Sequence, residues 1–183
     1  MTSSSLTCAS SQPVIVAYGD SLVTGYGASQ GDDIFTNLSS RIGVPIYNLG
    51  VSGDTSARAL ARIPTVLALK PDIVIVLVGG NDALQGVPVA ETEATIGTIL
   101  STLKSAGAIP VLLGVVGGFP NDSFKPMFER LAEEHEVVLV SNVLAGIFGD
   151  DRLMSDAIHP NAQGYARIAE RLQPILERVC VSS

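Results

Sequence analysis

The chain has 183 residues, of which 46% are hydrophobic, and a formal net charge of −7. This length supports one domain with a substantial core, and the apolar content argues against a disordered chain. An acidic chain without a cluster of Lys or Arg is a poor binder of nucleic acid or anionic membranes, and no apolar run approaches the ~20 residues of a membrane span. We therefore expect a small-molecule substrate, no nucleic-acid partner and no membrane insertion.

Short apolar runs alternate with longer amphipathic segments along the chain. Residues 1–12, mostly Ser, Thr and Ala, are expected to form a flexible lead-in to a single domain over residues 13–183. In chain order, the sequence predicts a strand at 13–18, a helix at 32–42, a strand at 45–49, a helix at 55–69 that Pro64 bends or restarts, a strand at 72–78, a helix at 89–106, a strand at 110–116, a helix at 124–135, a strand at 137–140 and a closing helix at 161–179 that Pro174 bends. Strands that are apolar on both faces and separated by helices indicate a parallel sheet covered on both sides.

Small polar residues follow the first three predicted strands. These loops read Gly19-Asp20-Ser21, Gly50-Val51-Ser52-Gly53-Asp54 and Gly79-Gly80-Asn81-Asp82. In open parallel sheets, function gathers in the loops that leave the carboxyl ends of the strands. Three such loops at one edge are more than ordinary turns require, so we predict a functional site there.

A serine nucleophile needs a base that takes its proton, and the base needs a partner that orients it. The chain has two histidines. His135 ends an acidic helical stretch, where it complements the helix C-terminus. His159 follows Asp156 by three residues, so that one turn brings the carboxylate to the imidazole. Ser21, His159 and Asp156 are therefore our candidate catalytic triad.

Acyl transfer also needs hydrogen-bond donors for the oxyanion that develops in the transition state. The candidates are the backbone N–H groups of Ser21 and Gly53 and the side-chain amide of Asn81. Glycine at position 53 suits a loop that approaches a ligand closely. A helix that starts near Ser21 would add a modest favourable field for negative charge.

The three loops, together with Asp156-Ala157-Ile158-His159-Pro160, resemble in order the four blocks of the SGNH (GDSL) hydrolase family, over residues 14–179. Three segments are most similar to the subgroup of bacterial thioesterase I, lysophospholipase L1 and arylesterases: Ser52-Gly53-Asp54-Thr55-Ser56, Leu60-Ala61-Arg62-Ile63-Pro64 and Gly79-Gly80-Asn81-Asp82-Ala83-Leu84-Gln85-Gly86. The resemblance implies a three-layer, flavodoxin-like α/β/α fold with five parallel strands in the order 2-1-3-4-5. It implies Ser21 as nucleophile, His159 as base and then acid, Asp156 as its orienting partner, and an oxyanion hole of Ser21, Gly53 and Asn81. No metal or organic cofactor is expected.

The loops at residues 83–89 and 117–122 carry small and apolar residues and no Lys or Arg. They favour short- to medium-chain acyl esters over highly charged substrates, and the family resemblance also allows thioesters and lysophospholipids. Asp82, Leu84, Val87 and Phe119 are our predicted substrate contacts. We expect a monomer or a weak oligomer.

Two other functions compete with the esterase. Asp20, Asp54 and Asp82 each follow a strand end, and three clustered carboxylates can hold Mg²⁺ for phosphoryl transfer. The segment 21–25 follows the first strand as the phosphate loop of a flavodoxin-like FMN-binding module would. The magnesium site would give Ser21, Asn81 and His159 no common role. The FMN-binding module lacks aromatic cover for a flavin, since the chain has no Trp and 4 Tyr.

Cys8 and Cys180 lie near opposite ends of the chain. They are either two free thiols or a disulfide, since the first strand begins and the last helix ends at the sheet edge opposite the site, which allows the ~6 Å between Cα atoms that a disulfide needs. A disulfide implies an oxidising compartment. We expect a periplasmic or secreted protein, with a cytoplasmic location as the alternative.

Overall fold

The computed structural model describes residues 13–116 and 123–180. Five parallel strands form one sheet in the order β2-β1-β3-β4-β5, which confirms the predicted fold. The strands are β1 (Ile15–Gly19), β2 (Ile46–Gly50), β3 (Ile73–Leu77), β4 (Ile109–Leu113) and β5 (Val138–Val140). Gly19 pairs with Gly50 on one side and with Leu77 on the other, so the first three strands end level with one another.

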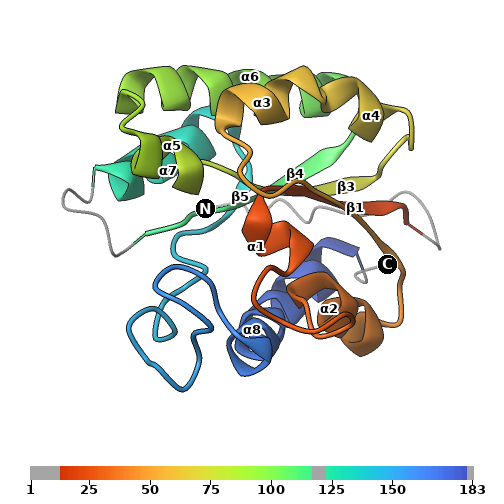
Figure 1. The fold of residues 1–183 in the computed structure, drawn as a ribbon. Coiled ribbons are helices and arrows are strands. Elements are labelled where there is room, and N and C mark those ends of the chain that lie inside the picture. Colours follow the sequence, from red (N-terminus) through yellow and green to blue (C-terminus); the bar gives the residue numbers. More distant parts are fainter. Residues whose placement is uncertain (1–12, 117–122, 181–183) are drawn as a thin grey trace.

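Helices cover both faces of the sheet (Figure 1). One layer holds α3 (Ser56–Ala61), α4 (Ile63–Leu67), α5 (Gly80–Gln85), α6 (Val89–Ser105) and α7 (Phe124–His135). The other holds α1 (Ser21–Thr24), α2 (Ile34–Ile42) and α8 (Ala162–Cys180). Among the described residues, none of the helices is both long and apolar enough to cross a membrane.

The sheet separates two hydrophobic cores. Ile75 of β3 belongs to the core beneath α2 and α8, and the next residue, Val76, belongs to the core beneath α3, α6 and α7. Both side chains are almost completely buried, as are all residues of β1 and β3. Because neighbouring side chains of a strand point to opposite faces, a strand covered on both sides must be apolar throughout.

Two predicted segments contain short helices. The helix expected over 55–69 restarts near Pro64 as predicted, and is divided into α3 and α4 at Arg62, because Pro64 occupies the first turn of α4, has no N–H to donate and would clash with the carbonyl four residues earlier. The stretch 83–89, expected as a loop, contains the end of α5. A helix of six residues shows no amphipathic period by which sequence analysis could recognise it.

Several predictions fall outside the described residues. The lead-in over residues 1–12, which includes Cys8, and the predicted substrate contact Phe119 are among them. The side chain of Cys180 is not described either. The disulfide therefore stays a prediction.

Candidate active site

Ser21 is the first residue of α1, and only Asp20 separates it from the end of β1. The Asp20 side chain caps this helix, because its Oδ1 accepts a hydrogen bond from the Leu22 N–H at 3.0 Å. Gly19 makes the turn possible, since a Cβ atom there would lie 1.9 Å from the Leu77 carbonyl oxygen of β3. The Ser21 side chain thereby faces the hollow beyond the carboxyl ends of the strands.

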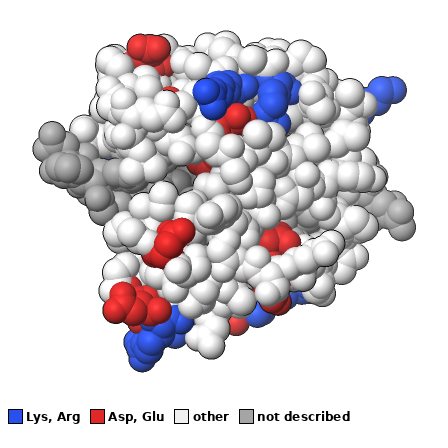
Figure 2. All heavy atoms as spheres, viewed as in Figure 1, with Lys and Arg blue, Asp and Glu red and all other residues white. Residues whose placement is uncertain are grey.

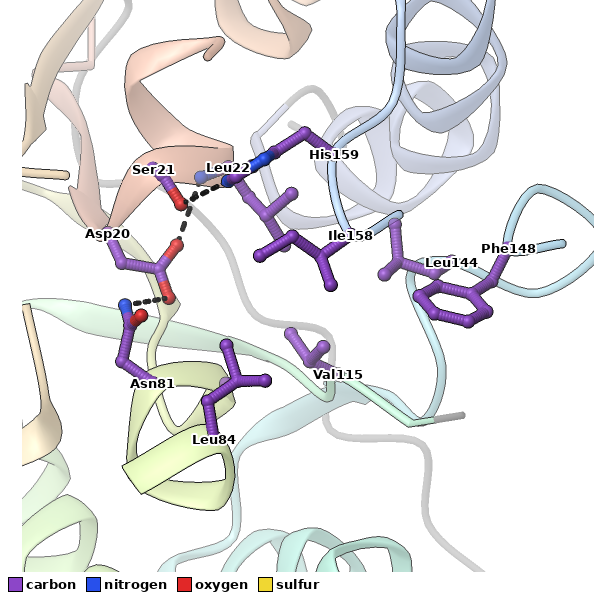
Figure 3. Close-up of a pocket in the computed structure, with 11 residues that line it drawn as sticks. Asp20, Ser21, Leu22, Asn81, Leu84, Val115, Leu144, Phe148, Ile158 and His159 are labelled. Atoms are coloured by element: carbon purple, nitrogen blue, oxygen red, sulfur yellow. Dashed lines mark hydrogen bonds between the residues drawn. The ribbon is translucent and has the colours of Figure 1, made fainter. Parts of the chain in front are cut away.

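The structure brings Ser21, His159 and Asp156 together, although 138 positions separate the serine from the histidine. His159 Nε2 lies 3.0 Å from Ser21 Oγ, and its Nδ1 lies 2.8 Å from Asp156 Oδ2 (Figure 3 shows the serine–histidine pair). Asp156 Oδ1 also accepts the backbone N–H groups of Ile158 and His159, both at 2.8 Å. One tight turn thus fixes the carboxylate beside the imidazole, as the three-residue spacing predicts.

The surroundings of Asp156 favour its charged form. Partial burial acts to raise the pKa of this carboxyl, but hydrogen bonds from the N–H of Ile158 and from the ring and N–H of His159 outweigh burial and hold the pKa below its usual range. An ionised carboxylate on Nδ1 directs the Nε2 lone pair of a neutral imidazole toward the serine.

Tyr26 is a neighbour of the triad that sequence analysis did not identify. Its ring centroid lies 4.5 Å from that of His159, with 47° between the ring planes. Its backbone is held on both sides, since its N–H donates to the Ser21 carbonyl at 3.0 Å and its carbonyl accepts the buried Tyr165 hydroxyl at 2.6 Å. The aromatic ring therefore lies beside the imidazole on a segment whose backbone is fixed. The signal in the sequence is only its position, five residues after the serine.

The predicted oxyanion donors lie in the segments that follow β1, β2 and β3. Asn81 lies in the first turn of α5 and lines the same hollow as Ser21. One N–H of its amide donates to the Asp54 carbonyl at 2.9 Å. Gly53 has φ +84°, a conformation that favours glycine, and immediately precedes Asp54 without itself lining the hollow. The same amide nitrogen also donates to Asp20 Oδ2 at 3.5 Å, a long hydrogen bond that an acceptor on a ligand could replace.

The three aspartates that suggested a magnesium site are buried and bonded separately. Asp20 caps α1, Asp54 pairs with Arg62 at 2.6 Å, and Asp82 accepts the Ser56 N–H at 2.8 Å and hydroxyl at 2.5 Å. In the described ranges, no group of three His, Cys, Asp or Glu side chains has the arrangement of a metal site. Asp82, which is also a predicted substrate contact, does not line the hollow, and its carboxylate accepts hydrogen bonds from Ser56 at the start of α3.

Burial of Asp20 has a consequence for its ionisation. Its side chain is almost wholly enclosed, which raises its pKa from 3.8 to about 7; the Leu22 N–H acts to lower it, while the charges of Asp54 and Asp82 raise it further. This carboxyl lies next to the nucleophile, and its Oδ2 is 3.5 Å from the amide nitrogen of Asn81. Its proton is therefore lost near neutral pH.

We expect Asp20→Asn to change how stability depends on pH. The folded protein keeps the Asp20 proton up to about pH 7, whereas the unfolded chain loses it near 3.8, so the free energy of unfolding falls as pH rises between these values. Asparagine caps a helix equally well but does not titrate. Urea unfolding across this pH range should show a slope that is less negative in the variant, by up to about 1.4 kcal/mol per pH unit.

The exposed Asp32 supplies the matched control for that measurement. Asp32→Asn also removes one carboxylate, but from the surface, and should leave the slope as in the parent protein. Equal slopes in the parent and Asp20→Asn would contradict a buried Asp20 that titrates near neutral pH.

An apolar hollow, partly open to solvent, adjoins the serine. Figure 3 shows that Leu84 of α5 and Ile158 approach it from opposite sides. The described side chains that line it include no Lys or Arg, and charged side chains are sparse in the middle of the face that Figure 2 shows. Its apolar lining residues are Leu22, Leu84, Val115, Leu144, Phe148 and Ile158.

Among the predicted substrate contacts, Leu84 lines this hollow and Val87 does not. Leu144 and Phe148 were missed by sequence analysis. Both lie in the irregular segment after β5, where no periodic pattern marks which side chains face inward.

Comparison with known proteins gives consistent results. The model of the GDSL-like lipase/acylhydrolase family matches residues 17–167. Thioesterase 1/protease 1/lysophospholipase L1 of Escherichia coli K12 is 33% identical over 181 residues, which cover 92% of this chain and 87% of that protein. The arylesterase of Vibrio mimicus is 31% identical over 134 residues, 69% of this chain and 67% of that protein.

Solved structures show the same likeness. The crystal structure of TesA superposes with a TM-score of 0.85 at 29% identity and covers 91% of this chain and 99% of its own. AlinE4, described as an SGNH-hydrolase family esterase, superposes with a TM-score of 0.74 at 30% identity, over 92% of this chain and 97% of its own.

Proposed function

Because this chain belongs to the GDSL-like lipase/acylhydrolase family and is a carboxylic ester hydrolase, we propose that it cleaves short- to medium-chain acyl esters through an acyl-enzyme on Ser21. The observation that carries the proposal is the hydrogen-bonded series Ser21–His159–Asp156 beside an apolar hollow. Nucleophilic catalysis requires a hydroxyl close to a base that a third group orients, and here the hydroxyl and the base are 3.0 Å apart.

In the acylation step, His159 Nε2 takes the Ser21 proton as Oγ bonds to the ester carbonyl carbon. The carbonyl π electrons move onto oxygen, and the N–H groups of Ser21 and Gly53 and the Asn81 amide stabilise the resulting oxyanion. The tetrahedral intermediate collapses when the bond to the alcohol oxygen breaks, and that oxygen receives the proton from His159. The charge of Asp156 stabilises the imidazolium that exists in between.

Deacylation repeats these steps with water as the nucleophile. His159 takes a proton from a water molecule that attacks the acyl carbon, and returns it to Ser21 Oγ as the acid leaves. The enzyme ends in its starting protonation state, and no cofactor takes part in the proposed cycle.

The hollow supports an uncharged acyl chain as the substrate. Its lining is mainly apolar, and an apolar pocket gains about 0.8 kcal/mol for each methylene it buries. The names of the relatives add thioesters, lysophospholipids and aryl esters as further substrate classes to test.

A series of 4-nitrophenyl esters from acetate to palmitate, with acyl thioesters of the same lengths, tests the proposal. We expect kcat/KM to peak among the short and medium chains and to fall toward palmitate. A maximum at palmitate would contradict the proposed chain length, and absence of hydrolysis across both series would contradict the esterase itself.

Filling the hollow should shorten the preferred acyl chain. Val115 is buried and lines the hollow, so Val115→Phe would place a ring in the space that we propose for the acyl chain. If two methylenes are excluded, kcat/KM for the octanoyl ester should fall about tenfold or more, while that for the acetyl ester changes little. The measured quantity is the octanoyl-to-acetyl ratio of kcat/KM.

Val44→Phe is the matched control, because Val44 is half-buried just before β2, at the opposite end of the strand from the site. It should leave the ratio unchanged. A ratio in Val115→Phe equal to that of the parent protein would show that the acyl chain does not occupy this hollow.

A further inference from the structure

Arg62 joins three segments behind the proposed oxyanion hole. Its Nε and Nη2 both contact Asp54 Oδ2, at 2.8 and 2.6 Å. Its Nη1 donates to the carbonyl of Leu49 in β2 at 3.2 Å, and its Nη2 donates to the carbonyl of Gly19 in β1 at 3.3 Å. One guanidinium therefore connects the ends of the first two strands to the loop that follows the second.

The guanidinium is held in place from a further direction. Its central carbon lies 4.9 Å from the centroid of the Tyr18 ring, which is fully buried and whose hydroxyl donates to the Ala59 carbonyl of α3. The Arg62 side chain is only 26% exposed. A planar group with several fixed donors can satisfy these partners at once, whereas a lysine ammonium cannot reproduce the fork.

Asp54, the ion-pair partner of Arg62, lies between two of the predicted oxyanion donors. Gly53 precedes it in a turn that the Asp54 N–H closes by donating to the Val51 carbonyl at 3.1 Å. The Asp54 carbonyl receives the amide of Asn81 at 2.9 Å. A displacement of Asp54 would therefore move both donors, and misplacement of a catalytic group by 1 Å can cost about 10²-fold in rate.

We propose that Arg62 is a positioning residue of the oxyanion hole, which acts through Asp54 on the Gly53 N–H and the Asn81 amide. Arg62 does not line the hollow, and the hydrogen bonds described above join it to Asp54, Leu49 and Gly19. The inference rests on the proposed function, because it assumes that these donors stabilise an oxyanion. It adds a residue outside the four sequence blocks to the determinants of the rate.

The first test is the effect of Arg62→Met and Arg62→Lys on steady-state kinetics. If donor placement depends on the guanidinium, kcat should fall about 10- to 100-fold with KM changed little, because the interaction that is lost forms only in the transition state. Lysine keeps the charge beside Asp54 and should restore the melting temperature more fully than it restores kcat. Arg58→Met, on the exposed side of α3, is the control and should match the parent protein.

A double-mutant cycle with Asn81→Ala separates positioning from a purely structural role. In the Asn81→Ala background, Arg62 can position only the Gly53 N–H. Arg62→Met should therefore lower kcat by a clearly smaller factor there than in the parent protein. Titration of reactive serine with a phosphonate corrects each kcat for inactive protein. If Arg62→Met does not fold, Arg62→Lys takes its place in the cycle.

An unchanged kcat in both Arg62 variants would overturn the proposal. So would an equal loss in the presence and absence of Asn81, which indicates general destabilisation. Failure of the proposed function can be distinguished from failure of this inference. If the proposed function is wrong, Ser21→Ala will retain turnover in a protein that still has Arg62.

Discussion

Replacement of Ser21 by alanine is expected to lower kcat by about 10⁴- to 10⁶-fold without loss of the fold. The variant lacks the atom that bonds to the acyl carbon, so the remaining groups can only assist attack by water. Ser21 Oγ is hydrogen-bonded to His159 and lies at the edge of the hollow rather than in either core, so its removal leaves no cavity in the packed interior. The measurement is kcat for the best ester of the chain-length series, with the melting temperature recorded in parallel.

Ser40→Ala provides the control for the serine. Ser40 lies on α2, is exposed and bonds only its own helix among the described residues, through the Thr36 carbonyl at 3.1 Å. Its removal should leave kcat unchanged. Turnover by Ser21→Ala at a rate near that of the parent protein would exclude Ser21 as the nucleophile.

Replacement of His159 by alanine is expected to have an effect of similar size. Without the imidazole 3.0 Å from Oγ, the serine proton has no acceptor, and the leaving alcohol has no proton donor. Because nucleophile and base act as a unit, the double variant Ser21→Ala/His159→Ala should be no slower than either single variant by more than a few-fold. The measured quantity is kcat in the two single variants and the double variant.

The second histidine of the chain is the matched control. His135 ends α7, and its Nδ1 lies 3.3 Å from the hydroxyl of Ser101 on α6, in the helical layer outside the site. His135→Ala should retain the activity of the parent protein. Loss of activity there, or its retention in His159→Ala, would contradict the assignment of the base.

The sequence predicts the regular elements well where periodicity and helix-ending residues agree. The helix expected at 124–135 has the bounds of α7, and that expected at 89–106 differs from α6 by one residue. Each strand of the sheet overlaps a predicted apolar run. The site followed from topology, because the carboxyl ends of parallel strands meet at one edge and bring distant loops together.

The remaining features depend on tertiary contacts that no local pattern encodes. Asp82 follows Asn81 directly and was expected beside the substrate. Consecutive residues of a helix are rotated by about 100°, so within α5 the carboxylate turns toward Ser56 while the amide faces the hollow. Arg62 belongs to a segment that resembles the family subgroup, but the resemblance assigns it no role, and only the assembled sheet places its guanidinium against two strand ends.

The identity of the nucleophile can be tested most directly by covalent labelling with an ethyl 4-nitrophenyl alkylphosphonate. We expect one equivalent of nitrophenol to be released, complete loss of esterase activity, and a phosphonyl adduct that peptide mass spectrometry assigns to Ser21. Ser21→Ala should remain unlabelled. Inactivation accompanied by an adduct on a different residue, or full activity in protein labelled at Ser21, would contradict the proposed mechanism.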